Sequence, residues 1–260
     1  IGVGTTRLRV HEDQTWIGAA GGVSYIQFNT ASTANYPADD YLFDSIGGGR
    51  MDNMGEVGLY SNHGNRNGSP ILLPGGTYAS FRTYGSVHYG SRVGQYKLDD
   101  HVSLMHGAPE VQDNDPDPDT VVEGNYSLDL AGHDLDGSEL ILNGYELDTV
   151  KGVRLMQSGT DPDFAPTSAP VAVDLTGAGS VLTIGGDLEY YEDTWSAGNN
   201  DGVDYKEGRR IGLHGDENSV VNLHGDFLTN TRSSMRGNGL YLSTMNLIGG
   251  SMGDPNTFEV

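Results

Sequence analysis

The sequence predicts an all-β protein built as a β-helix, or β-solenoid, with loops of variable length. Three observations lead to this prediction. Glycine accounts for 39 of the 260 residues, about twice its usual share. Gly, Asn-Gly and Asp-Gly breaks interrupt nearly every window that could hold an amphipathic helix. Between these breaks lie short alternating apolar runs, and a short apolar module recurs along the second half of the chain.

The first 110 residues carry the alternating runs but show the module poorly. Residues 23–28 (VSYIQF) and 78–84 (YASFRTY) alternate apolar and polar side chains, as half-buried strands do. This region also holds eight of the chain's 14 tyrosines. We expect residues 1–110 to be a Tyr- and Gly-rich β region that forms the first turns of the solenoid.

The recurring module is a small or polar residue, then two apolar residues two positions apart, then Gly. Its copies are spaced irregularly, which suits short strands joined by loops of different length. Each copy should point two apolar side chains inward and then turn at a Gly with positive φ. Stacked copies would bury a continuous apolar column. The copies span residues 126–132, 138–144, 171–177, 180–186, 219–225 and 243–249.

The module makes a specific prediction about the core. The paired apolar residues of the last three copies should face inward, one pair above the next. They are Leu182, Ile184, Val221, Leu223, Met245 and Leu247. A β-sandwich or jelly roll with similar strands is the alternative fold.

An acidic, proline-spaced segment separates the two parts of the chain. We therefore divide the sequence into the β region 1–110, an acidic linker or projecting loop at 111–124, and Gly-rich solenoid repeats at 125–260.

Two of the modules resemble repeats of large secreted bacterial surface proteins. Residues 179–188 (GSVLTIGGDL) and 218–228 (NSVVNLHGDFL) are similar to repeats of autotransporter-type passengers and of exported proteins with a PEP-type sorting signal. The closing segment 249–260 (GGSMGDPNTFEV) also resembles this group. The resemblance covers residues 125–260 and implies a secreted, right-handed β-helix without enzymatic activity.

Composition excludes several functional classes. Asp and Glu number 36 against 14 Lys and Arg, a net charge of -22. A field of that sign repels nucleic acid and anionic membranes. The chain has no Cys, which excludes disulfides and thiol catalysis. No apolar run is long enough to span a membrane as a helix. Because the chain starts at Ile1, we expect a processed protein or a fragment.

Two acidic segments are candidate Ca²⁺ sites, because Ca²⁺ prefers several oxygen ligands. Residues 113–119 (DNDPDPD) place a carboxylate at every second position, and residues 199–207 (NNDGVDYKE) surround an Asp-Gly turn. A solvated acidic loop and an ordinary turn are the alternatives. The ligands would be Asp113, Asp115, Asp117, Asp119, Asn199, Asp201, Asp204 and Glu207.

The sequence favours a structural function over catalysis. It contains neither a Gly-x-Ser-x-Gly elbow nor a complete phosphate-binding loop, and its histidines lack the spacing of a zinc site. The leading interpretation is an extracellular structural protein of the cell surface or a self-assembling fibre, not an enzyme. The alternative is a carbohydrate-binding or polysaccharide-degrading β-helix, with Trp16, or Trp195 beside Tyr190 and Tyr191, as a sugar-stacking platform.

The ends of the sequence carry no recognisable cap. The chain begins IGVG and stops at TFEV, which reads as the middle of a strand. Terminal turns of a solenoid leave backbone hydrogen-bonding groups unpaired unless a cap covers them. We therefore expect end-to-end contacts between copies of the chain, with a polysaccharide as the other candidate partner.

Overall fold

The computed structural model describes a chain of β-strands. The described residues are 8–10, 15–17, 26–29, 43–45, 49–60, 70–84, 92–111, 121–133, 136–159, 171–194, 211–231, 239–241 and 244–248. They contain no helix, and hence no helical membrane span. The Gly, Asn-Gly and Asp-Gly breaks noted in the sequence account for this, since they leave room only for short strands.

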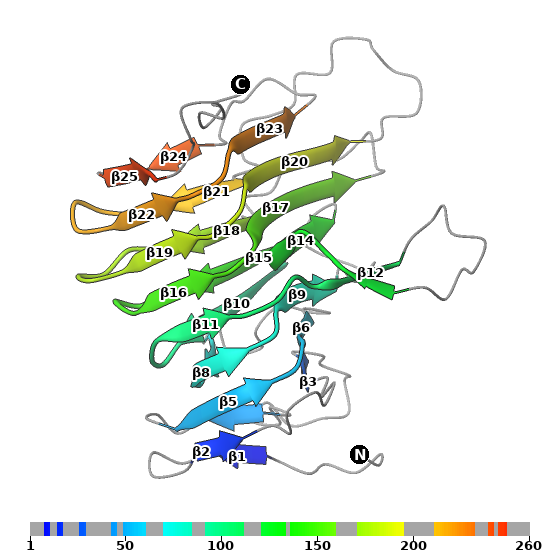
Figure 1. Cartoon of the computed structure of the whole chain (residues 1–260), viewed down its shortest axis with the longest axis vertical. Coiled ribbons are helices and arrows are strands. Elements are labelled where there is room, and N and C mark those ends of the chain that lie inside the picture. The colour runs from blue at the N-terminus through cyan, green and yellow to red at the C-terminus, as the bar shows by residue number, and fades with distance from the viewer. Residues whose placement is uncertain are drawn as a thin grey trace.

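Most strands fall into three stacks of parallel neighbours (Figure 1). Stack 1 holds β1 (Leu8–Val10), β4 (Phe43–Ser45), β7 (Ile71–Leu73), β10 (Arg92–Leu98), β15 (Asp136–Ile141), β18 (Val171–Asp174), β21 (Ile211–His214) and β24 (Gly239–Tyr241). In this stack β1 and β4 pair with each other, and β4 contacts β7 without a described strand pairing. Stack 2 holds β2 (Thr15–Ile17), β5 (Arg50–Met54), β8 (Gly75–Tyr78), β11 (Val102–Leu104), β16 (Glu146–Thr149), β19 (Val181–Ile184), β22 (Val220–Leu223) and β25 (Thr244–Leu247). Stack 3 holds β3 (Ile26–Asn29), β6 (Val57–Tyr60), β9 (Phe81–Tyr84), β14 (Tyr126–His133), β17 (Gly152–Gly159), β20 (Leu188–Thr194) and β23 (Phe227–Thr231).

The chain visits the three stacks in the same order again and again. After β1, β2 and β3 it returns to stack 1 with β4, and each later turn repeats the sequence. Figure 1 shows the result as blue strands at one end and orange strands at the other. A sandwich or jelly roll pairs its strands antiparallel, whereas these stacks are parallel. The architecture is therefore solenoid-like, as the sequence predicted.

Two antiparallel contacts between described strands depart from this scheme. One is a single bridge between β14 and β15, at His133 and Asp136. Between β11 and β14 the chain forms an antiparallel pair of β12 (Pro109–Val111) and β13 (Val121–Glu123). This pair projects from the side of the stacks near β9 and β14 (Figure 1). The fourth turn of the solenoid is thus the one that carries an inserted arm.

The apolar column exists in stack 2. Leu182 on β19 pairs with Val221 on β22, and Ile184 pairs with Leu223. All four side chains are completely buried. Burial of alternate residues on successive parallel strands is what the module predicted, and for these four residues the prediction is confirmed.

At the last described turn the prediction is partly wrong. Met245 on β25 pairs with Val221 but is only partly buried, and Leu247 is 51% exposed. Among the described residues β25 pairs only with β22. An inward-facing residue is covered from both neighbouring turns, so a strand with one such neighbour leaves its apolar side chains partly in water.

The irregular spacing of the modules has a simple origin. Copies of the module lie in different stacks: Leu140 and Val173 in stack 1, Leu182 and Val221 in stack 2, and Leu128 in stack 3. Counting from one copy to the next therefore mixes steps within a turn with steps between turns. Only copies in the same stack face each other across a strand pair.

Glycine ends the modules for two different reasons. Gly144 and Gly177 have φ of 86° and 115°, as predicted for a turn. For Gly186 and Gly225 the predicted reason is wrong, because neither has a positive φ. A Cβ on Gly225 would instead lie 2.4 Å from the backbone of Gly186. At this corner glycine is needed because successive turns touch backbone to backbone. Gly132 lies within β14 and ends no strand.

Candidate functional site

The outer face of stack 3 carries a row of charged side chains. Leu128 and Leu130 on β14 point into the core, so Asp129 between them points outward. Asp129 pairs in register with Arg82 on β9 and with Arg154 on β17, and Arg154 pairs with Glu189 on β20. We call these four residues the charged ladder. Their charges alternate in sign from strand to strand.

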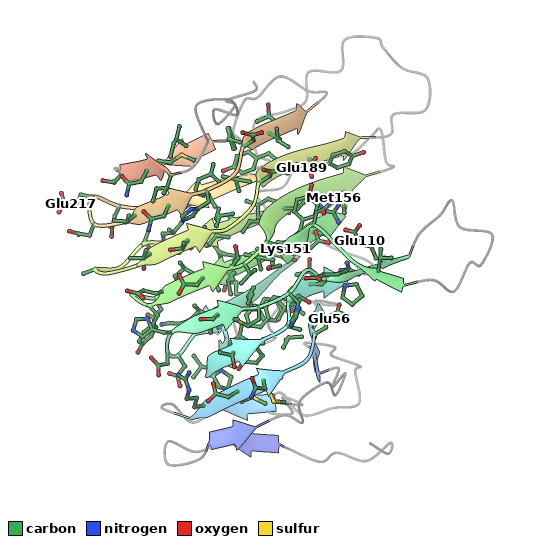
Figure 2. All side chains as sticks on the ribbon, viewed as in Figure 1. Glu56, Glu110, Lys151, Met156, Glu189 and Glu217 are labelled. Atoms are coloured by element: carbon green, nitrogen blue, oxygen red, sulfur yellow. The ribbon has the colours of Figure 1, made fainter. Side chains whose placement is uncertain are left out.

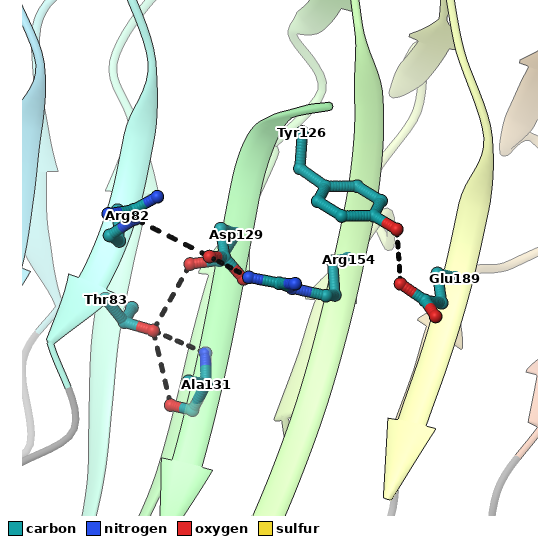
Figure 3. A network of polar contacts seen from close by, with 7 residues as sticks. All are labelled: Arg82, Thr83, Tyr126, Asp129, Ala131, Arg154 and Glu189. Atoms are coloured by element: carbon teal, nitrogen blue, oxygen red, sulfur yellow. Dashed lines mark hydrogen bonds and ion pairs between the residues drawn. The ribbon is translucent and has the colours of Figure 1, made fainter. Parts of the chain in front are cut away.

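Asp129 is the centre of the ladder. Arg154 binds it through two hydrogen bonds, from Nε to Oδ1 at 3.0 Å and from Nη2 to Oδ2 at 2.7 Å (Figure 3). Arg82 Nε lies 3.6 Å from Oδ2 as an ion pair. Asp129 is 5% exposed. Two-point binding of a buried carboxylate by a guanidinium fixes both side chains more firmly than a surface ion pair does.

Tyr126 extends the ladder toward β20. Its hydroxyl donates a hydrogen bond to Glu189, and the guanidinium carbon of Arg154 lies 4.6 Å from its ring centroid (Figure 3). Burial and the bond to Glu189 both raise the pKa of Tyr126. Burial alone would lower the pKa of Arg154, but the hydrogen bonds and charge of Asp129 outweigh it and raise that pKa. The tyrosine stays protonated and the arginine stays charged.

Beside the ladder, a side chain interrupts the backbone pairing of β9 and β14. The Thr83 hydroxyl accepts a hydrogen bond from Ala131 N and donates toward the Ala131 and Asp129 carbonyls, at 3.3 and 3.4 Å (Figure 3). The described pairing of these strands stops at Asp129 and Arg82. The side chain takes the place of backbone hydrogen bonds between the strands, so the described strand pairing ends just beyond the charged residues while Thr83 still links β9 to β14.

The inserted arm is anchored next to this place. Gly107 N donates to Glu123 Oε1 at 3.0 Å, which lowers the pKa of Glu123, and His106 Nδ1 lies 3.6 Å from the same oxygen. The other strand of the arm carries Glu110, whose charge acts on Arg154. Figure 2 places Glu110 and Glu189 toward stack 3, and Glu217 at the opposite side. The arm and Asp129, the centre of the ladder, therefore belong to the same, fourth turn of the solenoid.

The predicted Ca²⁺ ligands lie outside the described residues. This holds for Asp113, Asp115, Asp117 and Asp119 in the arm, and for Asn199, Asp201, Asp204 and Glu207. Within the ranges that the structure describes, no group of three or more His, Asp or Glu side chains could hold a metal ion. The Ca²⁺ prediction stays a prediction.

The proposed sugar platform is wrong for one of its members. Tyr190 is 1% exposed, and its ring packs edge-to-face on Phe227 at 5.0 Å. It fills the interior, so it cannot stack on a sugar. Tyr191 is half-buried, Trp195 lies outside the described residues, and Trp16 is on β2.

Sequence reasoning missed the charged ladder. Its members stand far apart in the chain and match no motif. A signal was nevertheless present in one module, where Asp129 stands between two inward leucines. Finding its partners required the register between strands, which the irregular turn lengths conceal.

The ladder's chemistry suits binding and rigid positioning. It offers guanidinium donors, a buried carboxylate and a protonated phenol, all held in register by parallel strands. No protein-family model matches the chain, and no curated protein or solved structure matches it either.

Proposed function

We propose that this chain is a structural protein of the bacterial cell surface or an extracellular fibre, that it is not an enzyme, and that copies of it associate end to end. We further propose that the solenoid is a closed, right-handed β-helix. The resemblance of residues 179–188 and 218–228 to repeats of secreted surface proteins supports both proposals. The observation that carries the self-association is that β25, among the described strands, pairs on one side only and exposes apolar side chains.

β25 is held in register by β22, but its apolar side chains are only partly shielded from water. It pairs with β22 over four residues, and the Asn246 amide donates to Asn222 Oδ1 at 2.8 Å. Yet Leu247 and Ile248 are 51% and 41% exposed. An exposed strand with apolar side chains and a fixed register can serve as a template for another strand. A further turn, supplied by a second copy, would continue the apolar column.

Net charge determines when this association can occur. At -22 copies repel one another, and salt shortens the range of that repulsion to about 10 Å at 0.1 M. Head-to-tail contacts join two different surfaces. They generate an open filament unless the rotation between successive copies closes a ring. Association should therefore grow with salt and with protein concentration.

The test replaces an exposed leucine of β25 by a charge. We expect Leu247→Glu to abolish concentration-dependent association in sedimentation velocity, because a carboxylate would be buried in the new contact. The matched control is Val150→Glu, which alters a residue that is 50% exposed on a turn within the stacks. It should associate like the wild type. Equal association of wild type and Leu247→Glu would reject the contact through β25.

A further inference from the structure

The register of β25 leaves two inward positions to be covered. Met245 pairs with Val221 on β22, and Leu247 pairs with Leu223. Val221 and Leu223 are completely buried, whereas Met245 is partly buried and Leu247 is 51% exposed. A strand that adds to β25 therefore needs apolar residues at two alternate positions, one beside Met245 and one beside Leu247.

The outward position between these two belongs to a row of polar side chains on stack 2. The Asn246 amide donates to Asn222 Oδ1 at 2.8 Å, and the Asn222 amide donates to Thr183 Oγ1 at 3.4 Å. Amide side chains at the same position of successive strands form such ladders in stacked parallel sheets. Among the described strands this row ends at Asn246. An amide on an added strand, in register with Asn246, would extend it.

The sequence of β3 meets both requirements. Ile26 and Phe28 are in register with Val57 and Leu59 on β6, which are completely buried. Ile26 and Phe28 therefore occupy the inward register positions of β3, and Gln27 occupies the outward position between them. Among the described strands β3 pairs only with β6. In Figure 1, β1, β2 and β3 lie at the opposite end of the stacks from β24 and β25.

We propose that β3 of a second copy pairs in parallel with β25 of the first. The two apolar residues of β3 would cover the two incompletely covered residues of β25, and its glutamine would continue the amide row. This inference rests on the proposed end-to-end association and adds which strands meet in it. The pairing sets Ile26 beside Met245, Gln27 beside Asn246, and Phe28 beside Leu247.

The order of the stacks agrees with this pairing. The chain passes through stacks 1, 2 and 3 in that order in each turn. The last described strand is β25 in stack 2, so the next position in this order lies in stack 3, beside β23. With β1 of the second copy in that position, β2 falls beside β24 and β3 beside β25. The second copy is then rotated by one stack about the axis relative to the first.

Stacking without this rotation is the competing arrangement. It pairs β2 with β25, and the register followed through stack 2 sets Trp16 beside Met245. Ile17 would then lie beside Asn246, where an isoleucine cannot extend the amide row. Because β2 ends at Ile17, it brings no residue beside Leu247. The rotated arrangement therefore matches β25 better.

Cysteine cross-linking distinguishes the two arrangements, because the chain itself has no Cys. Neighbouring strands lie about 4.7–4.9 Å apart, a distance that a disulfide can bridge between Cα atoms. Asn246→Cys is mixed with Gln27→Cys and oxidised at a salt concentration where the wild type associates. The matched control is Asn246→Cys mixed with Ile17→Cys. We expect covalent dimers from the first mixture, and only background from the control and from each variant alone.

A charge pair gives a second measurement that needs no cross-link. Asn246→Asp and Gln27→Lys place opposite charges beside each other in the proposed contact, where they attract. We expect a chain with both changes to associate more tightly than the effects of the two single variants add up to, in sedimentation velocity. Asn246→Asp combined with Ile17→Lys should show no such coupling. Melting curves of every variant establish that it is folded.

The outcomes separate this inference from the proposed function. A wild type that never associates overturns both. Association with cross-linking through Ile17 in place of Gln27 overturns the rotated pairing and leaves end-to-end association standing. The same holds if copies associate but Gln27→Cys gives no cross-link, or if the effects of Asn246→Asp and Gln27→Lys are simply additive.

Discussion

Ile184 shows what a single residue contributes to the stacks. It is completely buried on β19 and faces Leu223 on the next strand of stack 2. Truncation to Ala would leave a cavity that two ordered strands cannot easily close. We expect Ile184→Ala to lower the free energy of unfolding by about 2–5 kcal/mol, measured by urea denaturation. Val150→Ala, at a residue that is 50% exposed, should cost far less. A loss below about 1 kcal/mol at Ile184 would argue against a packed column.

Asp216 links charge to stability at a corner between stacks 1 and 2. Its carboxylate accepts hydrogen bonds from the backbone N–H of Gly177, at 3.0 Å, and of Asn218, at 2.8 Å. These bonds, that from Gly177 first, lower the pKa of Asp216. The folded state therefore binds a proton less readily than the unfolded state does. The resulting stability is present above the unfolded pKa and is lost as pH falls through the folded pKa.

The prediction for Asp216 concerns pH dependence. The wild type should be more stable than Asp216→Asn at neutral pH, and the difference should shrink as pH falls below about 4. Urea unfolding of both proteins between neutral and acid pH measures it. Asp148→Asn, which removes an exposed aspartate on β16, is the control for loss of one negative charge. A wild-type advantage that stayed constant, or grew, in acid would contradict the role of these hydrogen bonds.

At the scale of strands, the pair Asp129–Arg154 ties β14 to β17. Removing one partner of a buried ion pair leaves the other charge uncompensated. We expect Asp129→Asn to cost about 3–5 kcal/mol of unfolding free energy. The matched control is Asp52→Asn, at the exposed pair with Arg50, where about 1 kcal/mol or less is at stake. If both variants lower the free energy of unfolding by the same amount, the charged ladder stabilises the fold no more than an exposed ion pair does.

At the scale of strands, the sequence predicted the features that depend only on residues close together in the chain. The modules around Leu182 and Val221 were recognisable because alternation and a closing Gly are short-range patterns. The inserted strand pair β12–β13 was not predicted as strands, because its flanking residues are acidic and proline-spaced. The ladder was also missed, since Asp129 and Arg154 become neighbours only through the register of two strands separated by a variable turn. Corner glycines such as Gly225 were found, but their reason was backbone contact between turns.

For the molecule as a whole, the charge of -22 opposes compactness. Bound divalent cations would relieve this repulsion, and they stabilise the native state if they bind it preferentially. We predict that millimolar Ca²⁺ raises the Tm relative to EDTA, through Asp113–Asp119 or Asn199–Glu207. The control is Mg²⁺ at equal ionic strength, which should raise the Tm less because it loses its water reluctantly. Identical melts in EDTA and Ca²⁺ would reject the ion sites.

The central claim is a solenoid whose copies continue one another along its axis. Strands would then lie across the fibre and repeat along it at the inter-strand distance of about 4.7–4.9 Å. The most direct measurement is X-ray diffraction from aligned fibres grown at high salt, after electron microscopy has located them. The account predicts a reflection at that spacing on the fibre axis. A protein that stays monomeric at every concentration and salt, or a reflection at right angles to the axis, would contradict it.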